Sequence, residues 1–264
     1  MILNGKTDVG LKRATNQDTF AAQPVCPGVY LGLVCDGMGG TNGGNIASVL
    51  ARDTFCSQIQ TFFRQLRLAG KQPQRVGAGD YSALLAHSVV KANRAVFERA
   101  QQDAELRGMG TTLVAALVVG NHVHVVNVGD SRLYLMSGGE LSQVTRDHSL
   151  VQHLLDTGKI TQEEAKNYPN KNMITRAVGI EKRIEADILS VDLTGCDEAV
   201  LLLCSDGLSG FVSDEGIHTL LQAHFRPELR DAAAADRMVQ TLIDTANANG
   251  GGDNITAVLM AYQA

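Results

Sequence analysis

Four aspartates in this sequence stand beside short apolar runs, where predicted strands end or begin. Asp36 directly follows Leu31–Cys35, Asp130 follows Val123–Val128 after one glycine, Asp206 follows Leu201–Cys204 after one serine, and Asp253 comes just before Ile255–Met260. In an antiparallel sheet, the end of one strand lies beside the start of its neighbour. We therefore expect the four carboxylates to meet at one rim.

Carboxylates gathered in this way indicate bound cations. Gathering carboxylates costs free energy, because like charges repel and each buried carboxylate loses hydration. A hard cation such as Mg²⁺ or Mn²⁺, which prefers oxygen ligands, removes that cost. The glycines after Asp36 and Asp206 allow tight turns in which a backbone carbonyl also faces a metal. Asp-Gly is also a common turn dipeptide, so one such pair alone indicates only a turn. Only the set of four favours a metal site.

Two nucleotide-binding motifs do not fit. Counted from Gly37, the last glycine that a dinucleotide fingerprint requires falls on Asn42, and no GxxxxGK[ST] sequence occurs. A glycine loop that cradles phosphate is therefore not supported.

The elements that must position these aspartates are short apolar strands and three amphipathic helices. The predicted strands are Val29–Cys35, Leu113–Val119, Val123–Val128, Leu133–Met136, Ala199–Cys204 and Ile255–Met260. Glycine pairs punctuate the middle group, which predicts an antiparallel meander. Helical spacing appears over 46–66, 81–96 and 232–246. This arrangement favours an antiparallel sheet core covered by helices.

Composition narrows the class of protein. The chain has 264 residues, 44% hydrophobic residues and a net charge of −5, as in ordinary globular enzymes. Its longest apolar run, Leu113–Val119, is too short to cross a membrane, and no secretory signal is visible. Five cysteines without metal spacing indicate a reducing, cytoplasmic compartment. Mild acidity and the absence of tryptophan argue against nucleic-acid binding.

Eight short motifs occur in a characteristic order. They are Arg13–Asp18 (RATNQD), Asp36–Gly40 (DGMGG), Gly110–Thr112 (GTT), Val128–Arg132 (VGDSR), Asp147–Ser149 (DHS), Thr175–Gly179 (TRAVG), Cys204–Leu208 (CSDGL) and Asp253–Thr256 (DNIT). Together they resemble the metal-dependent protein phosphatases of type 2C, the PPM family, and in particular its compact bacterial branch.

The resemblance implies an α+β fold: a four-layer α-β-β-α sandwich of two mostly antiparallel sheets flanked by helices, with the aspartates at one end. It implies one catalytic domain over 1–264, with a flap over about 147–179. The implied activity is hydrolysis of phosphoserine and phosphothreonine in proteins by a water that bridges two metals. The resemblance further implies that the enzyme reverses phosphorylation by a bacterial serine/threonine kinase. Nothing in the sequence requires an assembly larger than a monomer.

Residue roles follow from the same resemblance. Asp36 bridges two Mn²⁺ or Mg²⁺ ions, and Gly37 offers its carbonyl to one of them. Asp206 and Asp253 complete the shell of the first ion, while Asp130 and Asp206 hold a third. Arg13 grips the substrate phosphate, so Arg13 and Asp36 are the expected catalytic residues. Asp18 does not bind a metal directly but holds a water molecule that is bound to one.

Two positions depart from the family pattern. Met38 stands where some relatives carry a histidine proposed as the general acid, which leaves the identity of that acid open. Bacterial members often have HxxGE after the paired glycines, whereas this chain has Thr41–Asn45 (TNGGN). All the metal-ligand positions are retained, so the enzyme is favoured over a phosphoprotein sensor without turnover. A phosphatase of the haloacid dehalogenase type needs a DxD nucleophile, which Asp36–Met38 lacks.

Other residues carry weaker expectations. Asn170, Lys171 and Asn172 are candidates for substrate contact, with solvated loop residues as the favoured interpretation. Arg176 is a candidate for orienting the flap or the acidic rim, or for a salt bridge alone. His122, His124 and His148 are interpreted as structural. The basic stretch Arg64–Arg75 is interpreted as a solvated connector rather than a docking patch.

Overall fold

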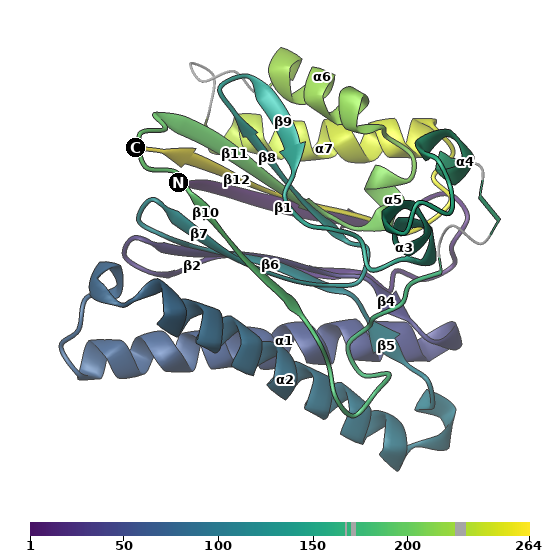
Figure 1. The fold of residues 1–264 in the computed structure, drawn as a ribbon, viewed down its shortest axis with the longest axis horizontal. Coiled ribbons are helices and arrows are strands. Elements are labelled where there is room, and N and C mark those ends of the chain that lie inside the picture. Colours follow the sequence, from purple (N-terminus) through teal and green to yellow (C-terminus); the bar gives the residue numbers. More distant parts are fainter. Residues whose placement is uncertain (167, 170–172, 225–230) are drawn as a thin grey trace.

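The computed structural model describes residues 1–166, 168–169, 173–224 and 231–264. Two five-stranded sheets pack face to face (Figure 1), in the orders β1-β12-β11-β8-β9 and β10-β7-β6-β3-β2, and all of their pairings are antiparallel. The strands of the first sheet are β1 (Ile2–Asp8), β8 (Arg132–Ser137), β9 (Glu140–Gln143), β11 (Glu198–Cys204) and β12 (Ile255–Gln263). Those of the second are β2 (Thr19–Cys26), β3 (Val29–Cys35), β6 (Leu113–Val119), β7 (His122–Val128) and β10 (Asp187–Asp192).

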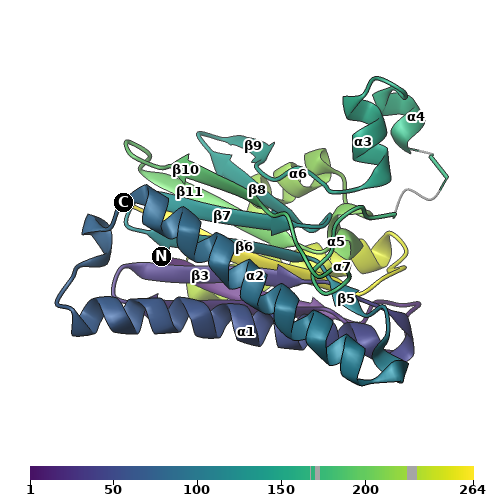
Figure 2. The ribbon, with the colours of Figure 1, turned by 60° about the horizontal axis from the view of Figure 1, so that its bottom comes forward.

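Helices cover both outer faces of this sandwich (Figures 1 and 2). The long helices α1 (Gly40–Leu68) and α2 (Ala78–Gln102) lie on the second sheet, while α6 (Asp214–His224) and α7 (Ala232–Ala248) lie on the first. Three apolar layers result, one under each helix layer and one between the sheets. The expected four-layer α+β sandwich is confirmed.

The six predicted strands are the six interior strands of the two sheets. The unpredicted strands β1, β2, β9 and β10 are the four edge strands, whose residues are mostly half-buried or exposed. An edge strand has one open side and one partner, so it needs no continuous apolar run. A two-stranded piece, β4 (Gly37–Met38) with β5 (Gly110–Thr111), was also not predicted.

The predicted meander is wrong at its third strand. β6 and β7 form a hairpin, but β8 leaves this sheet and pairs with β11 and β9 of the other. The chain crosses between sheets at Gly129–Ser131, and the positive φ of Gly129 (107°) redirects it. β7 and β8 each carry apolar residues on both faces, so the hydrophobic pattern alone does not reveal which sheet each of them joins.

The polar segment 147–179 leaves the sandwich at one end (Figure 2). It holds the short helices α3 (Leu150–Asp156) and α4 (Gln162–Lys166). The sites Asn170, Lys171 and Asn172 lie outside the described residues. One further helix, α5 (Asp206–Ser209), and two 3-10 turns, Pro73–Arg75 and Ala104–Leu106, complete the described elements. No described helix is both long enough and apolar enough to cross a membrane.

Candidate functional site

The aspartates singled out in the sequence share one cavity of about 540 Å³, which is lined by Arg13, Asp36, Gly37, Asp130, Asp206 and Asp253 among others. Asp36 and Asp130 follow β3 and β7 of one sheet, whereas Asp206 follows β11 and Asp253 precedes β12 of the other. The expected rim therefore exists, but it is assembled where the same ends of two packed sheets meet rather than within one sheet.

Thr112 connects the Asp36 and Asp130 sides of this rim. Its Oγ1 accepts a hydrogen bond from the Asp36 amide over 2.9 Å and lies 2.7 Å from Oγ of Ser131. The amide of Thr112 and the hydroxyl of Thr111 both donate to the Asp36 carbonyl over 2.8 Å. Three polar groups thus hold the Asp36 backbone, and Ser131 in turn holds the Thr112 hydroxyl, so the point from which the Asp36 carboxylate projects is fixed.

Gly37 fits a space that no side chain could enter. A Cβ atom at this position would lie 2.2 Å from the Gly44 carbonyl oxygen and 2.6 Å from that of Gln17. The sequence needs glycine here because the start of α1 and the loop before β2 both pack onto this backbone.

Asn254 ties the loop that carries Arg13 to the far side of the rim. Its Oδ1 accepts from the Gln17 amide over 2.8 Å, while Nδ2 donates to the carbonyls of Val9 and Thr15 over 2.9 and 3.0 Å. Arg13, in turn, donates from Nη2 to Oδ2 of Asp253 over 2.7 Å. Asn254 was not among the predicted site residues, and its place beside Asp253 in the DNIT motif was the available signal.

Asp18 is buried behind the rim. Its Oδ2 accepts hydrogen bonds from Ser205 Oγ and Thr256 Oγ1, each over 2.7 Å. Its Oδ1 is buried without a hydrogen-bond partner, and so is Oδ1 of Asp206. A buried carboxylate oxygen without a partner is costly, so both atoms indicate a ligand or water that belongs at this site.

Burial and mutual repulsion raise the pKa values of these carboxyls. Burial, followed by the charges of Asp18, Asp206 and Asp130, raises the pKa of Asp36 well above its usual range. Burial, followed by the charge of Asp253, raises the pKa of Asp206.

The two flanking carboxyls behave in the same way. Burial raises the pKa of Asp18 to about 7 although Ser205 and Thr256 donate to it, and burial with the charges of Asp206 and Asp147 raises that of Asp130 to about 7. Without cations, the site therefore keeps protons that carboxyls ordinarily release.

These residues fit hard divalent cations. The available donors are carboxylate and carbonyl oxygens, the ligands that Mg²⁺ and Mn²⁺ prefer. Among the described residues, no three Asp, Glu, His or Cys side chains already converge as ligands of a single ion. The aspartates instead face a cavity wide enough for ions together with water, which is how Mg²⁺ is usually held.

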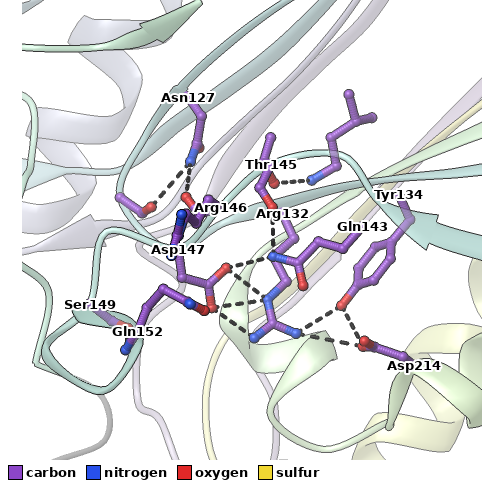
Figure 3. Close-up of polar contacts among 12 residues, drawn as sticks. Asn127, Arg132, Tyr134, Gln143, Thr145, Arg146, Asp147, Ser149, Gln152 and Asp214 are labelled. Atoms are coloured by element: carbon purple, nitrogen blue, oxygen red, sulfur yellow. Dashed lines mark hydrogen bonds and ion pairs between the residues drawn. The ribbon is translucent and has the colours of Figure 1, made fainter. Parts of the chain in front are cut away.

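A polar network joins β8, β9 and α6 to Asp147 at the start of the segment 147–179 (Figure 3). Arg132 donates from Nη2 and Nε to Asp147 over 2.7 to 3.1 Å and from Nη1 to the Tyr134 hydroxyl over 2.9 Å. That hydroxyl donates to Asp214 of α6 over 2.8 Å, and Gln143 donates to Asp147 over 2.9 Å. Arg132 and Asp147 lie in two of the eight sequence motifs, but no role was predicted for either residue.

A second cavity, of about 550 Å³, opens beside this network. Asp130 and Asp206 line both this cavity and the first one, and helix α3 contributes Val151 and Leu155 to the second. These two carboxylates thus border two spaces, one lined by Arg13 and the other by α3.

Arg176 points away from the rim carboxylates. It donates from Nη1 to Asp187 of β10 over 3.0 Å and lies 3.2 Å from Nε2 of His148. His148 Nδ1 accepts from the Gly129 amide over 3.1 Å, so the neutral ring carries its proton on Nε2, 3.1 Å from Asp187. Arg176 therefore makes a salt bridge between segment 147–179 and β10, and His148 contacts the same Asp187 carboxylate.

The two histidines of β7 differ in environment. His122 is exposed and pairs with Asp192 over 3.4 Å, and the buried His124 packs on Tyr81 with ring centres 4.7 Å apart. Neither belongs to a group of three or more potential metal-ligating side chains among the described residues.

Comparison with known proteins agrees with this geometry. Residues 12–259 match the family described as Protein phosphatase 2C. The serine/threonine phosphatase stp of Listeria monocytogenes is 36% identical over 256 residues, which cover 97% of this chain and 93% of that protein.

Two solved structures resemble the fold along almost its whole length. The S. agalactiae serine/threonine phosphatase gives a TM-score of 0.84 at 32% identity, covering 99% of each chain. The catalytic domain of the serine threonine protein phosphatase PstP, crystallised in complex with two manganese ions, gives 0.78 at 34% identity, covering 98% of this chain and 96% of that one.

Proposed function

The chain belongs to the protein phosphatase 2C family and is a hydrolase of phosphoric monoesters, and from this premise we propose that it dephosphorylates phosphoserine and phosphothreonine in proteins. In this reaction water forms the new bond to phosphorus, the bond from phosphorus to the serine or threonine oxygen breaks, and that oxygen gains a proton. Because kinases create such phosphoesters, the enzyme opposes a serine/threonine kinase.

One observation carries the proposal: Arg13 and the four rim aspartates line the same cavity. A phosphate ester is an anion and would be repelled by bare carboxylates, so the site works only when cations neutralise them. A guanidinium at the same wall supplies a planar donor for phosphate oxygens.

We assign the cations to particular residues. Asp36, the Gly37 carbonyl, Asp206 and Asp253 would hold two Mn²⁺ or Mg²⁺ ions, with Asp36 shared between them, and Asp130 with Asp206 would hold a third. The relative PstP was crystallised with two manganese ions. When bound, such ions neutralise the carboxylates and acidify the water that attacks phosphorus.

The remaining residues position the reactants. Arg13 binds the phosphate and stabilises the charge that develops on its oxygens. Asp18 offers Oδ1, which has no protein partner, to a water at the back of the site. Met38 lines the cavity but has no proton to give, so we assign protonation of the leaving oxygen to water. Segment 147–179 acts as the flap of a single catalytic domain, 1–264.

Phosphate release from matched phosphoserine, phosphothreonine and phosphotyrosine peptides tests the proposal. With Mn²⁺ we expect turnover of the first two peptides, slower turnover of the third, and none in EDTA. Equal turnover in EDTA would contradict the assignment of the rim to cations. Folded, Mn²⁺-loaded protein that binds the phosphopeptides without turnover would instead identify a phosphoprotein sensor.

A further inference from the structure

A further cavity lies far from the site, where α1 ends and α2 begins. It measures about 880 Å³, and its walls include Phe62, Leu66, Lys71, Arg75, Val76 and His87, which we name the helix-end groove. Figure 1 shows the α1–α2 connection at the opposite end of the molecule from β4 and β5, which adjoin the rim. Nothing in the proposed reaction uses this groove.

The groove is preformed. Beyond the end of α1, the Lys71 amide donates to the Leu66 carbonyl over 3.0 Å, which closes the turn. Pro73 begins a 3-10 turn, and its carbonyl accepts from the Tyr81 hydroxyl over 2.8 Å. Because the α1–α2 connection is already ordered, a partner that binds in this groove causes little further loss of conformational entropy in it.

Its charge is one-sided. Lys71 and Arg75 line the groove, and Asp80 is the one acid among the described lining residues. Arg64 and Arg67 belong to the same end of α1 without lining the groove. None of these four bases makes an ion pair with a described residue.

Arginines elsewhere on these helices are paired. Arg52 lies 2.8 Å from Asp53, and Arg94 lies 2.7 Å from Glu98. Two unpaired bases that line one cavity, with two more on the same helix end, are thus a local feature of a chain whose net charge is −5.

The groove combines this charge with apolar surface. Phe62, Leu66 and Val76 are partly exposed within it, and Leu68 of the same helix end is 79% exposed. A concave surface with an apolar floor and a basic edge fits a peptide better than a lipid bilayer, which presents no ridge to fill a cavity.

We propose that the helix-end groove docks an acidic amphipathic segment of a protein partner, in which Asp or Glu alternates with Leu or Phe. The apolar side chains fill the cavity, and the carboxylates pair with Lys71 and Arg75. Docking would contribute to substrate choice, because it would hold a phosphoprotein to the enzyme through a segment remote from its phosphorylated residue. This role, unlike the binding itself, rests on the proposed phosphatase function.

The distance to the site defines which substrates gain from docking. α1 has 29 residues and runs from the rim to the groove, so at about 1.5 Å per residue the two lie roughly 40 Å apart. A short phosphopeptide cannot span this distance. A substrate with a flexible linker of about forty residues has a root-mean-square reach of roughly 35 Å and can engage both.

Direct binding tests the groove without reference to catalysis. The probe is a fluorescein-labelled twelve-residue peptide of alternating Glu and Leu or Phe, followed by fluorescence anisotropy in EDTA. We expect saturable binding that weakens about tenfold or more in Lys71→Glu and Arg75→Glu. The matched control Arg237→Glu makes the same charge change on α7 and should bind like wild type.

Three outcomes would overturn the proposal. They are no saturable binding up to about 1 mM peptide, equal loss in the Arg237→Glu control, and binding of anionic vesicles or an oligonucleotide at the same residues in preference to the peptide. Because this assay needs no turnover, it separates failure of the docking site from failure of the phosphatase assignment.

Kinetics then test the role in substrate choice. For a phosphothreonine sequence joined through a forty-residue Gly-Ser linker to the acidic segment, we expect Lys71→Glu to raise KM about tenfold with kcat unchanged. The same variant should hydrolyse the short phosphopeptide like wild type. Equal effects on both substrates would contradict docking.

Discussion

Arg13 and Asp253 are separated by 240 positions in the sequence, yet they meet at the rim with Nη2 and Oδ2 2.7 Å apart. Their side chains are 54% and 25% exposed, and an ion pair this open contributes at most about 1 kcal/mol to stability. The pair therefore matters chiefly for orientation, because it holds a guanidinium at the wall of the carboxylate cavity.

Replacement of Arg13 should impair catalysis far more than folding. For Arg13→Ala we expect kcat/KM on a phosphothreonine peptide with Mn²⁺ to fall roughly 100-fold, because a donor to the phosphate is lost. Arg13→Lys should recover only part of this, since an ammonium lacks the planar fork. Steady-state kinetics and urea unfolding measure the two effects, with Arg94→Ala as the control arginine. A loss below threefold would contradict a phosphate-binding role.

The metal-free protein should lose stability as the pH rises. The folded-state pKa values of Asp18 and Asp130 are raised from 3.8 to about 7, so between these values the native state holds more protons than the unfolded state. The stabilisation is complete below the unfolded pKa and is lost as the pH rises through about 7. We expect the free energy of unfolding in EDTA to be lower at pH 8 than at pH 5.5 by roughly 2 kcal/mol for each of these two carboxyls.

Urea unfolding at the two pH values measures this difference. Asp130→Asn should reduce it, because the asparagine is neutral in both states, whereas the exposed Asp244→Asn should leave it unchanged. Metal-free protein that is equally stable at both pH values would show that these carboxyls titrate normally.

Mn²⁺ binding should release protons near neutral pH. Ligand carboxyls that retain protons in the metal-free state, as burial and repulsion predict for Asp36 and Asp206, must lose them when a cation binds. Apparent Mn²⁺ affinity should therefore fall as the pH drops below about 7. Calorimetric titration at pH 6.5 in two buffers of different ionisation enthalpy counts the protons. Identical heats in both buffers would refute the expected coupling.

Gly37 should not tolerate a side chain. The Cβ of Gly37→Ala would lie 2.2 Å from the Gly44 carbonyl oxygen, so we expect a loss of roughly 2 kcal/mol or more in unfolding free energy, together with weaker Mn²⁺ binding. Gly79→Ala is the control, because its Cβ meets nothing within 4 Å and it lies in the first turn of α2. Its stability should be unchanged or up to about 1 kcal/mol higher. Similar behaviour of the two variants would contradict the packing account.

Much of the fold could be predicted because the interior strands are apolar on both faces. Runs such as Leu113–Val119 are buried throughout, and their continuous apolar composition is enough to predict a strand. Edge strands such as β1 (ILNGKTD) are half-exposed and polar, so neither apolar runs nor alternation marks them. The transfer of β8 to the other sheet depends on long-range pairing with β11, which no local pattern encodes.

Site residues could be predicted where a short sequence motif marks them, but their contacts with residues far away in the sequence could not. Asp36, Asp130, Asp206 and Asp253 stand beside strands, and short motifs mark them. The partners of Asp18 are Ser205 and Thr256, 187 and 238 positions away, and only the packed sheets bring them together. The same holds for the link from Tyr134 to Asp214, 80 positions apart.

The most direct test of the account is Mn²⁺ titration of phosphate release from a phosphothreonine peptide by wild type, Asp36→Asn and the surface control Asp244→Asn. We expect Mn²⁺-dependent turnover in wild type and control, and a loss of roughly 1,000-fold in Asp36→Asn with the fold retained by circular dichroism. Wild-type rates and unchanged Mn²⁺ dependence in Asp36→Asn would contradict it, because the rim would then not be the metal site.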